Sequence, residues 1–209
     1  MNLCIIKHKE KNFVITTAIF GPMFSGKTTR ILRSIELCER YKLSYLSVKP
    51  LIDTRFGEHV LRSHEGNKYD NKEKIIILGK DSLSKITNIP KLVFVDEIQF
   101  FTQEEVELLL NKFSHSTFVL FFGLYDDYAG VPFPTSEYVK SFSDSTEFLH
   151  AQCHKCGGTA KHTQRLINGN PAPLGDRIIL GGEGNYEARC NDCWVPPSEA
   201  SYWWGSDIS

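Results

Sequence analysis

The chain has 209 residues, of which 41% are hydrophobic and 23% charged, a composition typical of a globular protein with a buried core. Lys and Arg (24) nearly balance Asp and Glu (25), and the net charge of −1 argues against a protein that holds nucleic acid mainly by its electrostatic field. No apolar run approaches the roughly 20 residues needed to span a bilayer, and the N-terminal apolar patch is too short for a signal peptide. We therefore expect a cytoplasmic protein with no membrane and no nucleic-acid partner, whose thiols stay reduced.

The first predicted elements are a buried strand over residues 13–20 and a helix that begins near Lys27. The strand is apolar and β-branched, and apolar side chains then recur at helical spacing. Between them, residues 21–28 match the phosphate-binding pattern Gly-x4-Gly-Lys-[Ser/Thr]. The expected ATP-binding residues of this loop are Gly21, Pro22, Met23, Phe24, Ser25, Gly26, Lys27 and Thr28.

Such a loop attracts polyphosphate because its N–H groups and the helix N-terminus are positively polarised. Lys27 is expected to reach the β- and γ-phosphates, and the Thr28 hydroxyl is expected to bind Mg²⁺. A glycine turn that matches the pattern by chance is the alternative. The order of strand, loop and helix favours the phosphate site.

A second strand is predicted over residues 43–48, ended by Lys49 and Pro50 because proline cannot donate to a sheet. Residues 51–71 are polar, and we expect a long irregular loop there. A short strand at 74–78 and one or two helical turns at 81–86 follow.

Residues 91–101 read KLVFVDEIQFF, a buried strand at 92–95 that delivers Asp96 and Glu97 at its carboxyl end. Parallel α/β sheets bind ligands at that end. Asp96 is expected to hold Mg²⁺, and Glu97 is placed to act as a base on the attacking nucleophile. An acid pair that merely ends a strand is the alternative. These residues leave open whether the nucleophile is water, as in an NTPase, or a substrate hydroxyl, as in a kinase.

A capping box at Thr102 and Glu105 predicts a helix through about residue 113. A strand at 117–122, a helix at 136–142 and an extended piece at 146–149 follow. Strands that alternate with helices predict an α/β fold, a P-loop domain over residues 1–150 with a mostly parallel sheet flanked by helices.

After residue 150, glycines, prolines and four cysteines replace the helical pattern, with β-like pieces at 163–167, 177–180 and 186–189. We predict a small β-rich zinc-binding domain over residues 151–195 and a C-terminal tail over 196–209. The pairs Cys153-x-x-Cys156 and Cys190-x-x-Cys193 can close a tetrahedral Zn²⁺ site. Disulfides or a redox pair are the alternatives, and a reducing cytoplasm disfavours them.

Several motifs in order carry a family resemblance: GPMFSGKT (21–28), DTRF (53–56), FVDEIQFF (94–101), GLYDDYAGVPF (123–133), CHKCGG (153–158), TQRLI (163–167) and GGEGNYEARCNDC (181–193). The chain resembles the small, zinc-containing class of thymidine kinases. The resemblance implies transfer of the ATP γ-phosphate to the 5′-hydroxyl of thymidine or deoxyuridine. It also implies a zinc-bound lasso that closes over the nucleoside, a homotetramer or homodimer, and feedback inhibition by dTTP.

The resemblance also implies roles for single residues. Glu97 matches the general base, Lys27 is the second expected catalytic residue, and Gln99 falls among the ATP-binding residues. The positions that match the thymine-binding surface are Met23, Phe100, Leu124, Tyr128, Phe133 and Tyr186, with the lasso backbone at Arg177, Ile178, Ile179, Leu180 and Gly181. Asp53 and Arg55 match a pair near the phosphates. Phe100 and Leu124 could instead be plain core.

Three positions depart from the family pattern, namely Tyr125, Tyr128 and Ala129, and they bear on substrate breadth rather than reaction type. Two other hypotheses remain: a nucleic-acid-stimulated ATPase in which Glu97 activates water, and a non-catalytic zinc-ribbon adaptor. The near-zero net charge disfavours the ATPase, and the intact phosphate loop disfavours the adaptor. Without the resemblance, the residues predict a Mg²⁺-dependent phosphotransferase or NTPase with a structural zinc.

Overall fold

The computed structural model describes residues 14–52, 59–63, 66–78, 83, 86–113, 117–177 and 185–197. Its elements in chain order are β1 (Ile15–Phe20), α1 (Lys27–Tyr41), β2 (Tyr45–Pro50), β3 (Val60–Arg62), β4 (Lys68–Asp70), β5 (Ile75–Leu78), β6 (Leu92–Val95), the 3-10 helix η2 (Ile98–Phe100), α2 (Gln103–Lys112), β7 (Phe118–Gly123), α3 (Pro134–Phe142), β8 (Ser145–Phe148), β9 (Ala151–Gln152), β10 (Thr159–Ala160), β11 (His162–Ile167), β12 (Asn170–Pro171) and β13 (Tyr186–Arg189).

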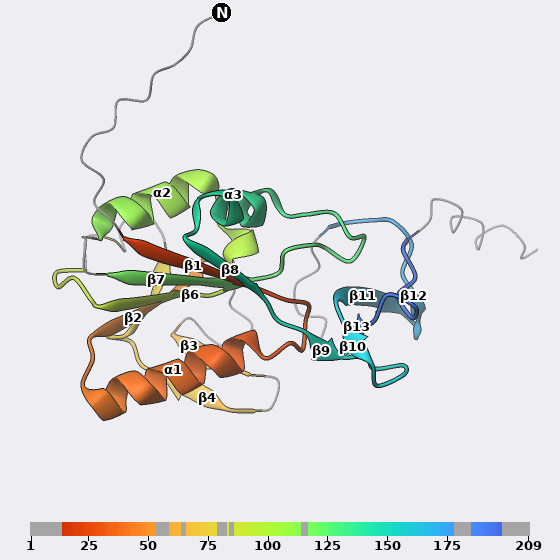
Figure 1. Cartoon of the computed structure of the whole chain (residues 1–209), viewed down its shortest axis with the longest axis horizontal. Coiled ribbons are helices and arrows are strands. Elements are labelled where there is room, and N and C mark those ends of the chain that lie inside the picture. The colour runs from red at the N-terminus through yellow and green to blue at the C-terminus, as the bar shows by residue number, and fades with distance from the viewer. Residues whose placement is uncertain are drawn as a thin grey trace, which may run out of the picture.

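Six strands form one parallel sheet in the order β5-β2-β6-β7-β1-β8. Helix α1 and the β3–β4 hairpin cover one face of this sheet, and α2 and α3 cover the other (Figure 1). The expected α/β architecture with helices on both faces is confirmed. All strand ends that carry site residues therefore meet at one edge of the sheet.

Two apolar layers hold the sheet between its helices. On the α1 side, Ile19 and Phe94 pack with the helix residues Ile31 and Ile35. On the other side, Val95 belongs to a cluster that includes residues of α2 and α3. The alternation of side chains along β6 explains how neighbouring residues enter opposite layers. Because both faces are covered, β1, β6 and β7 read as nearly continuous apolar runs in the sequence.

The capping box predicted at the start of α2 is present. The Glu105 N–H donates to Thr102 Oγ1 at 3.1 Å, and the Thr102 N–H donates to Glu105 Oε2 at 2.8 Å. The strand predicted at 43–48 exists but is shifted, because β2 continues through Pro50, which lies opposite Leu78 of β5. Proline keeps its carbonyl as an acceptor, so a strand can end on it.

The expectation of an irregular stretch over residues 51–71 is wrong in part. Strands β3 and β4 form an antiparallel hairpin there, with Leu61 opposite Tyr69. The physical reason is burial. Leu61 packs into the apolar layer between α1 and the sheet, and this packing stabilises the hairpin. Residues 53–58 and 64–65 lie outside the described residues, as does most of the helical turn predicted at 81–86.

We refer to residues 151–177 and 185–197 as the β-rich unit. Its strands form the pair β10-β9 and the sheet β12-β11-β13, all antiparallel. The unit lies at the end of the molecule where β1 leads into α1 (Figure 1). The expected β-rich part is thus present, while the division into domains at residues 150 and 195 stays a prediction. The expected tail lies largely outside the described residues.

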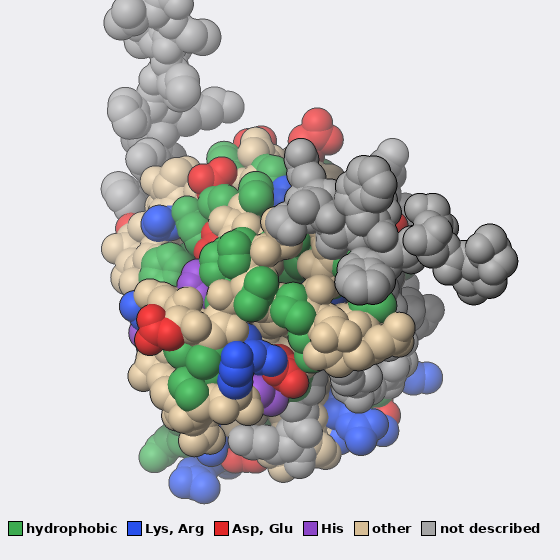
Figure 2. All heavy atoms as spheres, turned by 90° about the vertical axis from the view of Figure 1, so that its right-hand side faces the viewer, with side chains coloured by type: hydrophobic (Ala, Val, Ile, Leu, Met, Phe, Trp, Pro, Cys, Tyr) green, Lys and Arg blue, Asp and Glu red, His purple; other side chains and the backbone are tan. Residues whose placement is uncertain are grey.

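Seen from this end, hydrophobic side chains gather over the middle of the surface, with basic, acidic and histidine side chains grouped beside them (Figure 2). In the part of the chain that the structure describes, every helix is too short or too polar to cross a membrane.

Candidate active site and cysteine cluster

The phosphate loop, residues 21–28, joins the carboxyl end of β1 to the first turn of α1. Gly26 precedes the helix with φ +80°, in the left-handed region that glycine tolerates. The described helix α1 has no acidic residue in its first turn and no side chain capping its N-terminus. Its own side chains therefore do not neutralise its positive end, which suits an anion.

Lys27 lies across this loop. Its Nζ donates to the carbonyl oxygens of Gly21 at 2.9 Å and Pro22 at 2.8 Å. The ammonium group is thus held inside the loop that was predicted to bind phosphates. Thr28 follows Lys27 in the first turn of α1.

The loop is also fastened to the β-rich unit. The Met23 N–H donates to Thr163 Oγ1 of β11 at 3.0 Å. The Phe24 ring lies 4.8 Å from the His154 ring and packs against the small core that contains Cys153. Phe24 has φ +66°, a costly conformation for a residue with a side chain. Packing of its ring in the β-rich unit offsets that cost and holds the loop in shape.

The acid pair lies at the carboxyl end of β6, as predicted. Asp96 is buried, and its N–H donates to the Val48 carbonyl of the neighbouring strand at 2.9 Å. Glu97 follows with φ 54° and ψ 46°, and its N–H donates to Asp96 Oδ1 at 3.0 Å. The Asp96 carboxylate therefore holds the backbone of Glu97 at the edge of the sheet.

Gln99 connects Glu97 to the next strand. Its Nε2 donates to Glu97 Oε2 at 2.5 Å, and its Oε1 accepts from the Leu124 N–H at 3.0 Å. The sequence placed Gln99 among the ATP-binding residues; in the structure its side-chain amide joins Glu97 to the loop after β7. This bridge fixes the Glu97 carboxylate relative to two strand ends.

Of the residues expected to form the thymine-binding surface, Tyr128 and Phe133 are buried, and Tyr186 lies on β13. Leu124 and Phe100 are half-buried beside Gln99. Met23 lies in the phosphate loop, where its N–H reaches the β-rich unit. Residues 178–181 of the expected lasso, and also Asp53 and Arg55, lie outside the described residues.

Arg177, the first residue of that lasso segment, holds the loop after β7. Its Nε forms a 2.8 Å ion pair with the buried Asp127, and its Nη2 donates to the Val131 carbonyl at 2.8 Å. Its guanidinium carbon also lies 4.4 Å from the centre of the Phe133 ring. Nearby, burial raises the pKa of the Asp126 carboxyl, although His162 opposes the shift.

Sequence reasoning missed three residues that organise this region: Arg165, Asp127 and Trp194. Arg165 is 3% exposed within β11 and contacts Tyr128, Tyr186 and the chain at 176–177. The Trp194 ring stacks on His162 with 4.3 Å between centres, and its Nε1 donates to the Tyr128 carbonyl at 3.3 Å. For Arg165, the available signal was a charged residue inside the short predicted strand of the TQRLI motif. The partners of Arg165 could not be read from the sequence.

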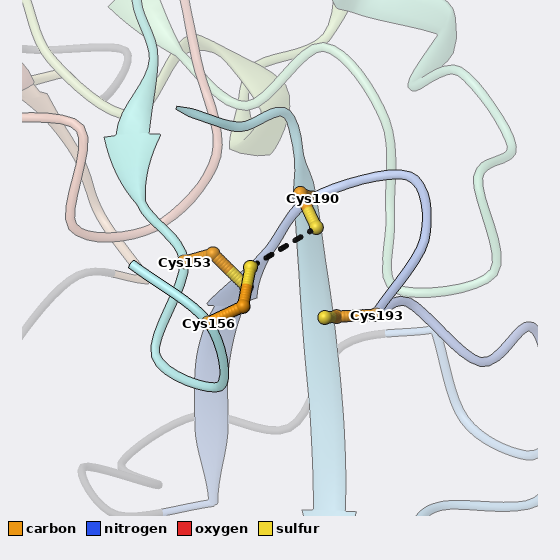
Figure 3. Close-up of side chains that lie close together, drawn as sticks. All are labelled: Cys153, Cys156, Cys190 and Cys193. Carbon is orange, nitrogen blue, oxygen red and sulfur yellow. Dashed lines mark hydrogen bonds between the residues drawn. The ribbon is translucent and has the colours of Figure 1, made fainter. Parts of the chain in front are cut away.

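The four cysteines of the β-rich unit converge (Figure 3). Cys153 and Cys156 lie on the turn after β9, and Cys190 and Cys193 lie at and after the end of β13, with all four Sγ atoms within 4.8 Å of one another. Cys156 and Cys190 have their Sγ atoms 3.6 Å apart, close to the roughly 3.8 Å edge of a tetrahedron with metal–sulfur bonds of about 2.3 Å. The five cysteines in the described part of the chain are all free thiols, which argues against the disulfide alternative.

The surroundings of these thiols shift their pKa values in opposite directions. Burial raises the pKa of Cys153, but hydrogen bonds from the backbone at residues 190, 156 and 155 outweigh it and bring that pKa to about 6. The hydrogen bond with Cys190, together with burial, raises the pKa of Cys193 to about 12. His154 Nδ1 accepts a hydrogen bond from the Ala188 N–H at 3.1 Å, so this ring nitrogen is already occupied by a backbone donor. The four cysteines could hold a metal ion by themselves.

A parallel α/β sheet, a Gly-Lys-Thr loop at the end of one strand and an acid pair at the end of another define a P-loop nucleotide-binding protein, here with a four-cysteine cluster. Within this class the family is shown by comparison. A family model described as "Thymidine kinase" matches residues 15–194, and the chain belongs to the thymidine kinase family.

Curated relatives extend over most of the chain. A thymidine kinase of Pyrobaculum aerophilum is 39% identical over 186 residues, covering 86% of this chain and 97% of the relative. One of Thermococcus kodakarensis is 34% identical, covering 87% and 94%, and one of Mycoplasma capricolum is 31% identical, covering 87% and 88%. A solved C-terminal domain of a possible DNA helicase from Lactobacillus plantarum aligns with a TM-score of only 0.34 and 11% identity, covering 66% of this chain and 86% of that one.

Membership of this family identifies the chain as a kinase, a phosphotransferase. The sequence-based recognition of the family is confirmed, and the ATPase alternative is not favoured.

Proposed function

We propose that this protein transfers the γ-phosphate of ATP to the 5′-hydroxyl of thymidine or deoxyuridine and forms the nucleoside 5′-monophosphate. The observation that carries the proposal is the position of Glu97. Its carboxylate is held by Gln99 at the carboxyl end of β6, next to Asp96, in a chain of the thymidine kinase family that also has an intact phosphate loop.

Each residue has a defined part in the proposed reaction. The phosphate loop and the N-terminus of α1 bind the ATP phosphates, and Lys27 moves its ammonium from the loop carbonyls to the β- and γ-phosphates. Thr28 and Asp96 would hold Mg²⁺, which supplies charge neutralisation between the phosphates when bound. The donor set fits, because magnesium prefers oxygen ligands.

Glu97 accepts the proton of the 5′-hydroxyl as that oxygen bonds to the γ-phosphorus. The bond between the γ-phosphorus and the bridging oxygen breaks, and ADP leaves with its electron pair. A carboxylate fixed by a hydrogen bond at a strand end is a suitable base, since proton transfer depends on a fixed short distance.

We propose that the base of the nucleoside binds where the loop after β7 meets the β-rich unit. Tyr128, Phe133 and Tyr186 supply aromatic surface there, and Phe100, Leu124 and Met23 add apolar contacts nearer the phosphate loop. A neutral base is well held between aromatic faces with few polar anchors. The backbone of residues 178–181 is proposed to read the edge of the base, and Asp53 and Arg55 to lie near the phosphates.

The departures from the family pattern divide into two kinds. The Tyr125 ring packs 5.3 Å from Phe20 and 5.4 Å from Phe148, so this substitution belongs to the packing of the sheet edge. Tyr128 and Ala129 lie in the loop beside the proposed base site, where they bear on deoxyuridine tolerance.

We also propose that the metal of the cysteine cluster is a structural Zn²⁺, that the protein is a cytoplasmic homotetramer or homodimer, and that dTTP inhibits it.

A product assay tests the proposal. Purified protein with ATP and Mg²⁺ is offered a panel of nucleosides, with ADP release in the absence of nucleoside as the control. We expect thymidine to yield its 5′-monophosphate, with little ADP formed in the control. Equal ADP release with and without nucleoside would mean that water is the acceptor, and the kinase proposal would fail.

A further inference from the structure

Arg165 is the most deeply buried cation of the β-rich unit and lies at the centre of its contacts with the loop after β7. It is 3% exposed in the middle of β11. Among the described residues, no carboxylate forms an ion pair with it. A buried cation without a counter-charge is costly unless neutral groups satisfy all of its donors.

Each of the three guanidinium nitrogens of Arg165 has a neutral hydrogen-bond acceptor here. The guanidinium carbon lies 3.8 Å from the centre of the Tyr128 ring, and Nε donates to the Tyr186 hydroxyl at 3.1 Å. Nη1 donates to the Asp176 carbonyl at 2.5 Å, and Nη2 donates to the Arg177 carbonyl at 3.1 Å. One planar group thus joins the loop after β7, strand β13 and the chain at 176–177.

The Tyr128 hydroxyl reinforces the same connection. It accepts from the Gly175 N–H at 2.8 Å and lies 3.1 Å from the Pro173 carbonyl, to which it can donate. The ring of Tyr128 is therefore held on its face by Arg165 and at its hydroxyl by residues 173–175. The chain that enters segment 178–184 is consequently fixed from two sides just before that segment begins.

We propose that Arg165 is a positioning residue for the nucleoside: it holds Tyr128, Tyr186 and the chain at 176–177 in the arrangement that binds the base, without touching the nucleoside itself. The inference rests on the proposed function. It assigns the buried charge a purpose that an apolar residue could not serve, because only a planar fork can stack on a ring while donating to two successive carbonyls.

Arg165→Lys tests this directly, since it keeps the charge and loses the stacking face and the fork. We expect the KM for thymidine to rise about tenfold, the effect of losing one or two net hydrogen bonds, while the KM for ATP stays near its original value. The matched control is Arg189→Lys in the same sheet, because Arg189 pairs with Glu187 of its own strand and no hydrogen bond joins it to Tyr128 or Tyr186 among the described residues. Its Nη1 also donates to the Cys193 carbonyl at 3.4 Å, so the metal content of this control must stay unchanged. Metal content and melting temperature are measured for both variants.

If Arg165→Lys does not fold, Arg165→Met is used as the test variant. Replacing a buried cation with an apolar side chain of similar size often leaves the protein as stable as before, or more stable. A folded variant with the thymidine KM of the original protein would overturn the inference. Parallel increases in both KM values with loss of metal would also overturn it, because they indicate a general structural role. Failure of the unaltered protein to phosphorylate thymidine would instead overturn the proposed function, and this inference with it.

Discussion

Glu97 combines an unfavourable backbone with a fixed side chain. Its left-handed φ of 54° costs about 1 kcal/mol or more for a residue with a Cβ atom. Two hydrogen bonds hold this turn: the Glu97 N–H donates to Asp96 Oδ1, and the Glu97 carboxylate accepts from Gln99 Nε2. A strained residue held on both sides suits a group that must meet a substrate proton at a fixed distance.

Glu97→Gln is expected to lower kcat about 100-fold or more, because the amide keeps the size of the side chain but cannot accept the 5′-hydroxyl proton. ATP binding, measured by calorimetry, is expected to persist, since the loop and Lys27 remain. Glu104→Gln is the control, a neutralised exposed acid in the first turn of α2. A Glu97→Gln enzyme with undiminished kcat would show that another group removes the proton.

At the scale of elements, the site depends on how closely the end of β7 approaches η2. A Cβ atom on Gly123 would lie 2.4 Å from Gln99 Oε1 and 2.8 Å from Ile98 Cγ2. Only glycine leaves the Gln99 amide room to join Glu97 and Leu124. The last residue of β7 is therefore part of what positions Glu97.

Gly123→Ala is expected to push Gln99 aside, lowering the free energy of unfolding by about 1–3 kcal/mol through overpacking. Because Glu97 loses its bridge, kcat should fall while ATP binding changes little. Gly175→Ala is the matched control for stability: a Cβ atom there meets open space and φ is not in the left-handed region. Melting curves check both variants, and steady-state kinetics check Gly123→Ala. A Gly123→Ala protein with unaltered melting temperature and kcat would rule out the bridge.

Elements buried on both faces were predictable, because continuous apolar runs identify β1, β6 and β7. The capping box located the start of α2 to the residue. The β3–β4 hairpin was missed because Val60 and Leu61 are two apolar residues within a polar stretch, and their burial under α1 depends on tertiary packing.

In the site, motif residues were predictable by type, but their connections were not. Glu97 follows β6 in the sequence, whereas its partner Gln99 also depends on β7 lying next to β6. Arg165 gains its function only from segments that the fold brings together. Hydrogen bonds between distant segments leave no periodic signal in the sequence.

At the scale of the whole molecule, the β-rich unit supports both the phosphate loop and the loop after β7. Phe24 packs against the cysteine-containing core, and Thr163 accepts from the Met23 N–H. Trp194, which directly follows Cys193, donates from its Nε1 to the Tyr128 carbonyl, and its ring reaches within 3.1 Å of the Cβ position of Gly130. The geometry of the cysteine cluster is thereby transmitted to both proposed substrate sites.

Removal of the metal is therefore expected to weaken binding of both ATP and thymidine. The proposed Zn²⁺ would contribute folding free energy to such a small unit through its four thiolate ligands, so the melting temperature should fall on chelation. The unstacking of Trp194 from His162 should alter its fluorescence. Metal content, melting curves and calorimetric titration with each substrate provide the measurement, before and after treatment with chelator.

Two variants distinguish the effect of losing a cluster thiol from the effect of losing any cysteine. Cys156→Ser removes one cluster thiol and should reproduce the effects of chelation. Cys38→Ala removes a thiol on the buried face of α1, outside the cluster, and should leave the metal content unchanged. If metal-free protein bound ATP and thymidine as the untreated protein does, the β-rich unit would hold its shape by packing alone, and the contacts through Phe24 and Trp194 would not depend on the metal.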